Sequence, residues 1–405
     1  MGGHRIITKT EFGCQNTEIL ITINVREEGK TMTMLLWLII SILVVAAAIG
    51  AMVYLVIRVY QFPFIEKISD KKMIKTGMSL LMVLVLVACL WIAMGYINAI
   101  ICVIHLVVFW LFCDFIAWLL RRIFKKQTRR GVVGIFAVLI TIMYLTIGWY
   151  LDYHVWETDY TVQTEKQTGN IRIVQMADSH IGATFDGEGF ARYVVEMQKQ
   201  NPDVVLITGD FVDDGTSKAD METACKALGT MKTKYGIYYV FGNHDKGYYG
   251  KEHRGYDGDD LKAELEKNGV NVLEDESVLI DNRFYIIGRQ DLSEETEHKK
   301  KRATMTELTE KLDKDKFMVV MDHQPCDYTK QEEADVDLVL SGHTHGGQLI
   351  PINYVGEWIG QNDKTYGYEK RKNTSFVVTS GISDWEIKFK TGCKSEYVVI
   401  NVEGK

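Results

Sequence analysis

Five short apolar runs in the C-terminal part of the chain are each followed directly by aspartate, histidine or asparagine. The last run ends in Gly342-His343-Thr344-His345-Gly346-Gly347, where two imidazoles two positions apart can converge on one small volume. Imidazole nitrogens and carboxylate oxygens are ligands of divalent transition metals, and a pair of adjacent metal ions requires such convergence. The four upstream clusters are Asp178-Ser179-His180, Gly209-Asp210, Gly242-Asn243-His244-Asp245 and Asp322-His323-Gln324-Pro325.

The runs before these clusters have the length and composition of buried β-strands. In an open α/β sheet, sites assemble beyond the carboxyl ends of the strands, so the five clusters are expected to meet. Each cluster alone could be an ordinary turn or a structural histidine. Five of the ten histidines of the chain lie in them, however, which favours one shared site. The expected strands are Ile171–Met176, Val204–Thr208, Ile237–Phe241, Phe317–Met321 and Val336–Leu340.

A pair of metal ions at this site would suit the hydrolysis of a phosphate ester. The ester's negative charge repels hydroxide, and two divalent cations about 3.5 to 4 Å apart both generate the nucleophile and neutralise charge. A carboxylate is the natural bridge because each of its oxygens can bind one ion, which favours Asp210. His244 is expected to add about 10² to 10⁴ in rate by proton transfer. Mixed nitrogen and oxygen ligands favour Mn²⁺, Fe or Zn²⁺ over a Ca²⁺ cage.

The ordered motifs D-x-H, G-D-x-x-D, G-N-H-D, H and G-H-x-H resemble those of the calcineurin-like metallophosphoesterase superfamily, over about residues 170 to 402. The resemblance implies an α/β four-layer sandwich, in which two mixed β-sheets are flanked by helices. It also implies that His244 is a general acid or charge stabiliser and that Asp245 orients it. The implied ligands are Asp178, His180 and His345 for one metal, Asn243, His323 and His343 for the other, and Asp210 as the bridge.

Other segments of this domain are less tightly constrained. The pattern predicts helices over Glu188–Gln200 and Ala219–Met231, and short strands around turns over Asn271–Gly288. The charged segment Ser293–Lys316 is expected to be a helical, solvated excursion whose basic run could instead touch anionic lipid headgroups. The segment Gly381–Glu386 departs from bacterial relatives, which often carry a proline and an arginine there, so substrate contacts do not carry over.

The first part of the chain has the composition of a membrane protein. Four apolar stretches each reach or approach the roughly 20 residues that a membrane-spanning helix needs, and the second and third are separated only by a tight turn at Tyr96-Ile97-Asn98. We therefore expect a four-helix transmembrane domain at residues 32–153 and a phosphoesterase domain at residues 154–405. The expected spans are Met34–Tyr60, Gly77–Tyr96, Ala99–Leu120 and Val132–Tyr150.

The distribution of Lys and Arg predicts the orientation of these spans. The first-to-second and third-to-fourth connections are rich in both residues, and the second-to-third turn has none, so the two basic connections are expected to be cytoplasmic. This places the N-terminus and the large C-terminal domain on the extracytoplasmic face of a plasma membrane. His105 and Asp114 in the third span point in opposite directions at about 100° per residue and are expected to be a packing residue and an interfacial acid.

Residues 1–31 form an irregular leader without a helical or strand period. One hypothesis is that it is not translated, because Arg26-Glu27-Glu28-Gly29 can be encoded by codons that resemble a ribosome-binding site before Met32 and Met34. The net charge of the whole chain, −7, argues against nucleic acid as a partner. The seven cysteines include no C-x-x-C pair, so neither structural zinc nor a disulfide framework is expected.

Together these features predict a membrane-anchored dimetal phosphoesterase that hydrolyses a phosphomonoester, phosphodiester or pyrophosphate through a metal-bound hydroxide. Its partners would be the lipid bilayer and a phosphorylated small-molecule or lipid substrate. The main alternative is a non-catalytic sensor that binds a phosphorylated ligand and signals through the membrane domain. A sensor has no need of a proton donor such as His244. A transporter with a fused hydrolase is disfavoured because the spans contain so few polar residues.

Overall fold

The computed structural model describes residue 42, residues 46–125 and residues 130–405. The chain divides into two compact units at Thr141 and Ile142. The leader at residues 1–31 and the first part of the expected first span lie outside the described residues.

The first unit is built from apolar helices. Three of the described helices are long and apolar enough to cross a membrane: Lys72–Met94, Tyr96–Phe124 and Gly131–Tyr153. A shorter apolar helix, Ala46–Tyr60, is the described end of the expected first span. Many of their large apolar side chains are exposed, as expected of surfaces that face lipid. The helices of this part are α2 (Pro63–Glu66), α3 (Lys72–Met94), α4 (Tyr96–Phe124) and α5 (Arg130–Tyr153).

The tight turn between the second and third expected spans lies one residue earlier than predicted. Gly95 alone separates α3 from α4, and Tyr96-Ile97-Asn98 is already helical. Gly95 has φ 84° and ψ 165°, a backbone conformation that is essentially restricted to glycine. Glycine at this position therefore allows the chain to turn from α3 into α4 without a longer loop.

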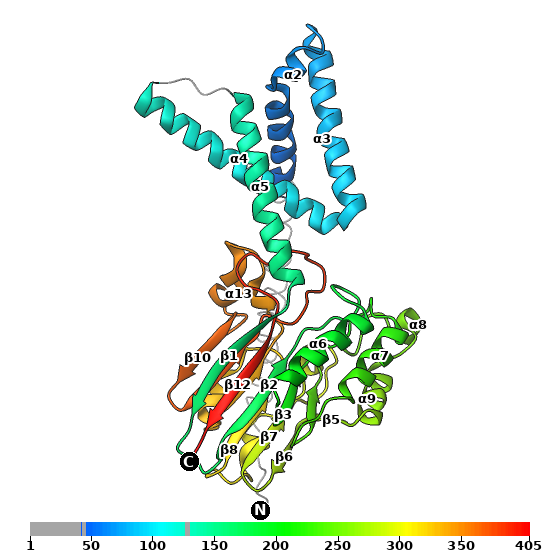
Figure 1. Ribbon diagram of the computed structural model, residues 1–405, viewed down its shortest axis with the longest axis vertical. Helices are drawn as coiled ribbons and strands as arrows, with labels where there is room; N and C mark the ends of the chain where they lie inside the picture. The colour runs from blue at the N-terminus through cyan, green and yellow to red at the C-terminus, as the bar shows by residue number, and fades with distance from the viewer. Residues whose placement is uncertain (1–41, 43–45, 126–129) are drawn as a thin grey trace, which may run out of the picture. The chain divides into compact units, whose positions relative to one another are not determined.

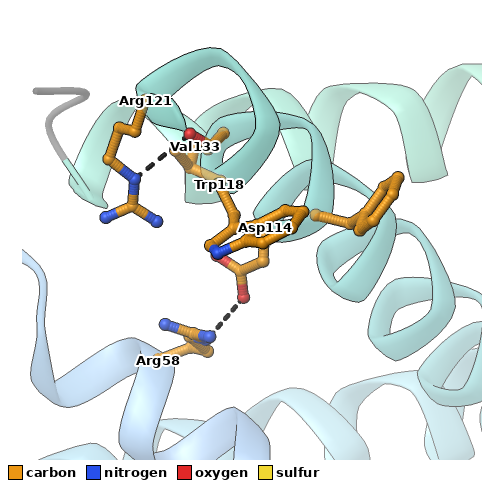
Figure 2. A pocket seen from close by; sticks show the side chains of 7 residues that line it. Arg58, Asp114, Trp118, Arg121 and Val133 are labelled. Atoms are coloured by element: carbon orange, nitrogen blue, oxygen red, sulfur yellow. Dashed lines mark hydrogen bonds and ion pairs between the residues drawn. The ribbon is translucent and has the colours of Figure 1, made fainter. Parts of the chain in front are cut away.

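Asp114 is paired with side chains of the helix Ala46–Tyr60. Its carboxylate accepts a hydrogen bond of 2.6 Å from the Tyr54 hydroxyl and forms an ion pair with Arg58 (Figure 2). Arg121 lies on the same helix as Asp114, and its Nε donates to the Ala117 carbonyl (Figure 2). His105 Nδ1 lies 2.8 Å from the Ile101 carbonyl oxygen of its own helix.

The second unit contains two six-stranded sheets (Figure 1). In the first sheet, β2, β3, β4 and β5 are parallel. Strand β12, from the C-terminus, lies between β1 and β2, parallel to β1 and antiparallel to β2. In the second sheet, β7, β8, β9 and β11 are parallel, and β6 and β10 are antiparallel edges. Both sheets are thus mixed. The strands of the first, in spatial order, are β1 (Trp156–Gln163), β12 (Glu396–Glu403), β2 (Ile171–Met176), β3 (Val204–Thr208), β4 (Ile237–Val240) and β5 (Val270–Val272). Those of the second are β10 (Gly367–Arg371), β11 (Thr374–Val378), β9 (Leu338–Ser341), β8 (Phe317–Met321), β7 (Phe284–Gly288) and β6 (Glu276–Ile280).

Three apolar cores separate four layers of secondary structure. Successive residues of a strand point to opposite faces, so Val205 packs with the helices outside the first sheet while Leu206 packs between the sheets. Helices α6, α7 and α9 cover the first sheet, and α11 and α12 cover the second. The expected four-layer sandwich of two mixed sheets flanked by helices is confirmed. The helices are α6 (Gly187–Lys199), α7 (Lys218–Leu228), α8 (Lys251–Arg254), α9 (Gly258–Lys267), α10 (Ser293–Thr296), α11 (Met305–Thr309), α12 (Tyr328–Glu333) and α13 (Val355–Trp358), with 3₁₀ turns η1 (His345–Gly347) and η2 (Ile352–Tyr354).

The excursion after β7 differs from the expected solvated helix. It contains only the short helices α10 and α11, and Arg302, from the basic run between them, is buried. The Arg302 guanidinium donates to the buried Asp322 carboxylate and to the Gln290 carbonyl. Arg289 contacts the same carboxylate at 3.1 Å. Arg302 therefore anchors the excursion to the end of β8, a long-range contact that has no local sequence signal.

Replacing Arg302 by methionine should lower the free energy of unfolding by about 3 kcal/mol, because the buried Asp322 carboxylate loses a charged partner. The same change at Lys301, whose side chain is 76% exposed, should cost less than about 0.5 kcal/mol. Urea titrations of the full-length variants in detergent, followed by circular dichroism, compare the two. Equal transition midpoints would contradict the anchoring role of Arg302.

Candidate metal centre

The candidate site lies where strands of both sheets end. The loops after β2, β3 and β4 of the first sheet carry three of the predicted clusters, and the loops after β8 and β9 of the second carry the other two. Because these strands are parallel within each sheet, their carboxyl ends share one edge. Residues that are far apart in sequence are thereby brought together in one small region.

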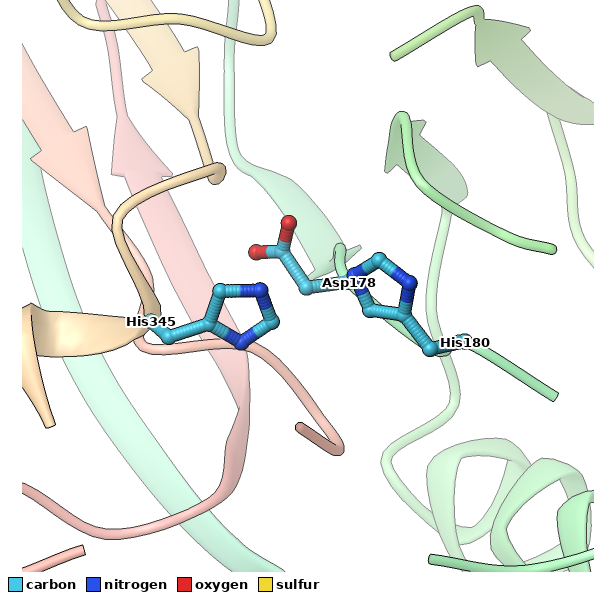
Figure 3. Close-up of side chains that lie close together, drawn as sticks. All are labelled: Asp178, His180 and His345. Carbon is cyan, nitrogen blue, oxygen red and sulfur yellow. The ribbon is translucent and has the colours of Figure 1, made fainter. Parts of the chain in front are cut away.

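The first group consists of Asp178, His180 and His345. All three are buried, and each offers one ligand atom within 4.8 Å of the others. Figure 3 shows the three side chains converging, with His345 arriving from one side and His180 from the other. This is the set of residues expected to hold one metal ion.

The second group consists of Asp210, His323 and His343, and each again offers one ligand atom within 4.8 Å of the others. The Asn243 amide oxygen joins them, at 2.9 Å from His343 Nδ1 and 3.2 Å from His323 Nε2. The Asn243 amide nitrogen donates to the Tyr248 hydroxyl at 2.9 Å, which turns the amide oxygen toward the two imidazoles. The remaining four predicted ligands are thus also in one place.

Asp210 lies between the two groups. Its Oδ2 is 3.1 Å from His323 Nε2 in one group and 3.7 Å from His180 Nε2 in the other. Its Oδ1 accepts a hydrogen bond from the His244 backbone N–H at 2.9 Å. This position between the groups is the one that a bridging carboxylate would need.

The backbone that carries these residues is unusual. Asp178, His180, Asp210, His343 and His345 all have positive φ, between 36° and 69°. Non-glycine residues rarely adopt this conformation, and it costs on the order of 1 to 3 kcal/mol at each position. Such strain persists where the surrounding fold enforces it, which is common at functional sites.

Two glycines allow the loops to approach closely. A Cβ at Gly242 would lie 2.2 Å from Asp210 Oδ1, and a Cβ at Gly342 would lie 2.6 Å from Asp178 Oδ2. The glycines of these motifs are therefore needed so that the carboxylates fit against the neighbouring loops.

Oxygen atoms behind three of the histidines fix the rings. Nδ1 of His323 donates to the Thr208 carbonyl at 2.7 Å, so its Nε2 faces the site. Nδ1 of His345 is 3.0 Å from the Asp384 carboxylate, and Nδ1 of His180 is 3.5 Å from the Asp213 carboxylate. Hydrogen bonds of this kind orient metal-binding imidazoles and raise their basicity.

The charges of the site are strongly coupled. Burial alone would raise the pKa of Asp210, but the adjacent His323 and His180 imidazoles hold it well below its usual range. Burial opposes protonation of His323, yet the Asp210 carboxylate raises the pKa of that ring well above its usual value. By contrast, burial lowers the pKa of His343 to about 4 and that of His345 to about 3. The Asp210 carboxylate therefore requires positive charge beside it, while two other rings stay neutral with free lone pairs.

His244 lies at the rim of the groups. Its half-buried ring is 5.0 Å from the His180 ring and 5.3 Å from that of the exposed Trp385, measured between centroids. Burial lowers the pKa of His244, and the nearby Asp210 carboxylate partly offsets this. A phosphate beside the ring would favour its protonated form, because the opposite charge stabilises it.

The orienting role expected of Asp245 stays a prediction, and its carboxylate contacts backbone groups of two loops. Its buried carboxylate accepts hydrogen bonds from the backbone N–H groups of Asp210, Phe211, Val212 and Gly242, at 2.7 to 3.1 Å. Both of its oxygens therefore accept hydrogen bonds from the loop backbone. Asp245 holds the loop after β3 against the loop after β4.

Three residues of the site were missed in the sequence. Asp213, behind His180, is the final aspartate of the G-D-x-x-D motif and could have been identified from it. Asp384 and Trp385 follow β11, and the rule that polar residues beyond strand ends build sites could have pointed to them. Asp384 and Trp385 lie in Gly381–Glu386, the segment that departs from the bacterial pattern.

The last turns of α5 also support this region. The Lys390 N–H donates to the Gly148 carbonyl at 3.0 Å, and the Ser395 N–H donates to the Leu151 carbonyl at 2.9 Å. Asp152, at the end of the helix, is buried beside Asp384. The end of this apolar helix therefore packs directly behind a residue that contacts the His345 ring.

Comparisons with known proteins agree with the geometry. The family model of the calcineurin-like phosphoesterases matches residues 171–347. The uncharacterised metallophosphoesterase YkoQ of Bacillus subtilis is 30% identical over 209 residues, which cover 49% of this chain and 73% of YkoQ. An uncharacterised metallophosphoesterase of Campylobacter jejuni is 27% identical over 238 residues, covering 58% of this chain and 60% of that protein. A transmembrane protein with a metallophosphoesterase domain from Danio rerio is 28% identical over 245 residues, covering 56% and 52%. The chain thus spans less than two thirds of the length of the last two relatives.

Replacing Asp245 by asparagine should lower the free energy of unfolding by about 2 to 4 kcal/mol, because an amide NH2 takes the place of one carboxylate oxygen and two of the four buried backbone N–H groups lose their acceptor. His244→Ala is the matched control at the next position, and its transition should stay close to that of the parent. Urea titration of the full-length protein in detergent measures both. If Asp245→Asn instead left stability unchanged and lost only catalytic rate, Asp245 would have the orienting role that the resemblance implies.

Proposed function

The chain belongs to the calcineurin-like phosphoesterases, and on this premise we propose that it is a membrane-anchored hydrolase of phosphate esters that uses two divalent metal ions. The substrate would be a phosphomonoester, a phosphodiester or a pyrophosphate. The observation that carries this proposal is the position of Asp210 between two groups of buried ligand-type residues.

The chemistry of the donor set fits two metal ions. Nε2 of the buried His180 has no hydrogen-bond partner among the described residues, which is costly for a polar group unless another ligand satisfies it. Asp178, His180 and His345 would hold one ion, Asn243, His323 and His343 the other, and Asp210 would contact both. Four imidazoles with carboxylate and amide oxygens suit Mn²⁺, Fe or Zn²⁺. When bound, two such ions lower the pKa of water and neutralise phosphate charge.

The protein's own residues would supply position and a proton. His244 Nδ1 or Nε2 would donate a proton to the leaving oxygen, because the ring stands at the rim beside both groups. The neutral Asn243 limits the negative charge of the ligand set, so that an anionic substrate can enter. Asp213 and Asp384 would keep the His180 and His345 rings aimed at the ions.

The chain is a membrane protein by the length and composition of its helices, and we propose that it resides in the plasma membrane with the phosphoesterase domain outside the cytoplasm. The excess of Lys and Arg in two of the connections supports this orientation. We also propose a lipid-linked or membrane-proximal phosphate compound as substrate, since anchoring restricts the search to two dimensions.

The activity can be tested on full-length protein in detergent or nanodiscs, stripped of metal and reconstituted with Mn²⁺, Zn²⁺ or Fe. We expect metal-dependent hydrolysis of at least one of four substrate classes: phosphomonoesters, phosphodiesters, pyrophosphates or lipid phosphates presented in the nanodisc. Phosphate binding without turnover on any class, with every metal, would contradict the hydrolase and favour the sensor.

The bridging role predicts different outcomes for two variants. Asp210→Asn should abolish activity and reduce metal at both positions, because one carboxylate serves both ions. His244→Ala should retain the metal and lose about 10² to 10⁴ in rate, because only proton transfer is removed. Metal content by mass spectrometry and turnover are measured on the same samples. Two full equivalents of metal in Asp210→Asn would count against the bridge.

Orientation can be tested with a reporter enzyme that is active only outside the cytoplasm. Fused after Lys405 it should be active, and fused near Lys126 it should be inactive, because the basic connection is expected to stay in the cytoplasm. The reverse pattern would overturn the proposed topology.

A further inference from the structure

Half of the large apolar side chains exposed between residues 156 and 405 lie within ten consecutive residues, 350–359. We call this segment the apolar loop. A cluster of exposed apolar side chains on a folded domain marks a surface that contacts another molecule or a membrane. The exposed side chains of the loop are Ile350, Ile352, Tyr354, Val355, Trp358 and Ile359.

The apolar loop has a defined conformation. It consists largely of η2 and α13, and Val355, Trp358 and Ile359 share one face because they are three and four positions apart. Glu357 is the only charged residue of the loop, and its carboxylate accepts a hydrogen bond from the Thr365 N–H of the domain. The polar side of the loop is thus held by the domain, and the apolar side faces outward.

The loop is tied to the last turns of α5 through Thr391. The Ile350 N–H donates to the Thr391 hydroxyl at 3.0 Å, and the neighbouring Lys390 N–H donates to the Gly148 carbonyl at 3.0 Å. The Thr391 methyl packs on Gly148, where an added Cβ would lie 2.9 Å from it. All of these residues belong to the same compact unit. One residue therefore separates the loop from α5 at the level of Gly148.

Gly148 lies close to the expected boundary of the bilayer. Counted from Gly131 at 1.5 Å per residue, about 20 residues cross a hydrocarbon core of about 30 Å, which ends near Tyr150. Aromatic side chains gather there: the Trp149 and Tyr153 rings are 4.9 Å apart, and Trp156 follows. Trp and Tyr are enriched at the interface between membrane and water. A bilayer crossed by α5 over these residues would have its interface at the level of the apolar loop.

We infer that the apolar loop inserts into the interface of the same bilayer that α5 crosses, with Trp358 and Ile359 at the boundary between headgroups and acyl chains. Short amphipathic segments with Trp and Ile on one face bind membranes in this way. The loop is a second contact with the lipid, in addition to the spanning helix. The loop begins three residues after Gly347, and the missing side chain of Gly347 leaves room for the Asn353 backbone of the loop. Insertion of the loop would therefore hold the neighbouring His345 turn next to the headgroups.

The inference can be tested by spin labelling of the full-length protein in nanodiscs of phosphatidylcholine and phosphatidylglycerol. A nitroxide would be attached to Trp358→Cys or, independently, to Ile359→Cys, with Cys14, Cys89, Cys113 and Cys326 replaced by alanine. Val195→Cys on α6, where an apolar side chain is 57% exposed, is the matched control. Labels at 358 and 359 should collide severalfold less with chromium oxalate in the water, and more with oxygen, than the label at 195.

Two outcomes would overturn the inference. Equal accessibility of the labels at 358 and 195 to chromium oxalate would place the loop in water. Spin–spin broadening at 358 that disappears on dilution with unlabelled protein would show that a second copy of the chain covers the loop. Circular dichroism of the labelled variants, compared with the parent protein, checks that they are folded, whichever result is obtained. Lipid insertion is measured independently of any activity, so its failure is distinguishable from failure of the proposed hydrolysis.

Discussion

Carboxylates and imidazoles are buried together in one small region. Their charges must be balanced there, and the rest of the domain depends on this electrostatic constraint. Asp178, Asp210, His180 and His323 are all buried. Buried charges without partners are strongly destabilising, so such a cluster persists only where opposite charge is supplied. Two divalent cations would supply it. The left-handed backbone of the candidate ligand residues and the glycines against their carboxylates keep these side chains directed to one place.

The support of the site extends beyond the residues that would touch metal. Asp245 joins two loops through backbone hydrogen bonds, and Asp322 joins the His323 loop to the buried Arg302. On the other side, Asp384 lies between the His345 ring and the end of α5. The sequence predicted a domain boundary between residues 153 and 154. Such a boundary would separate the last turns of α5 from the loop with Asp384 that they support. The membrane helix and the site are therefore structurally continuous within this unit.

The strands and the candidate ligands could be predicted because their signals are local. Buried parallel strands are continuous apolar runs, so the bounds of β2, β3 and β8 agree with the sequence to the residue. The supporting contacts could not be predicted in this way. The pairing of Arg302 with Asp322 and the approach of Asp384 to His345 depend on how distant segments pack, and a basic run looks the same in sequence whether it is solvated or buried. The turn between α3 and α4 was placed one residue too late because helix ends are the least certain part of a sequence interpretation.

The central claim is that Asp210 bridges two metal ions, and anomalous X-ray diffraction from crystals grown with Mn²⁺ tests it most directly. The account predicts two anomalous peaks about 3.5 to 4 Å apart. One peak should contact Asp178, His180 and His345, the other Asn243, His323 and His343, and one oxygen of Asp210 or both should contact the two ions. A single peak, or two peaks of which only one contacts Asp210, would contradict it.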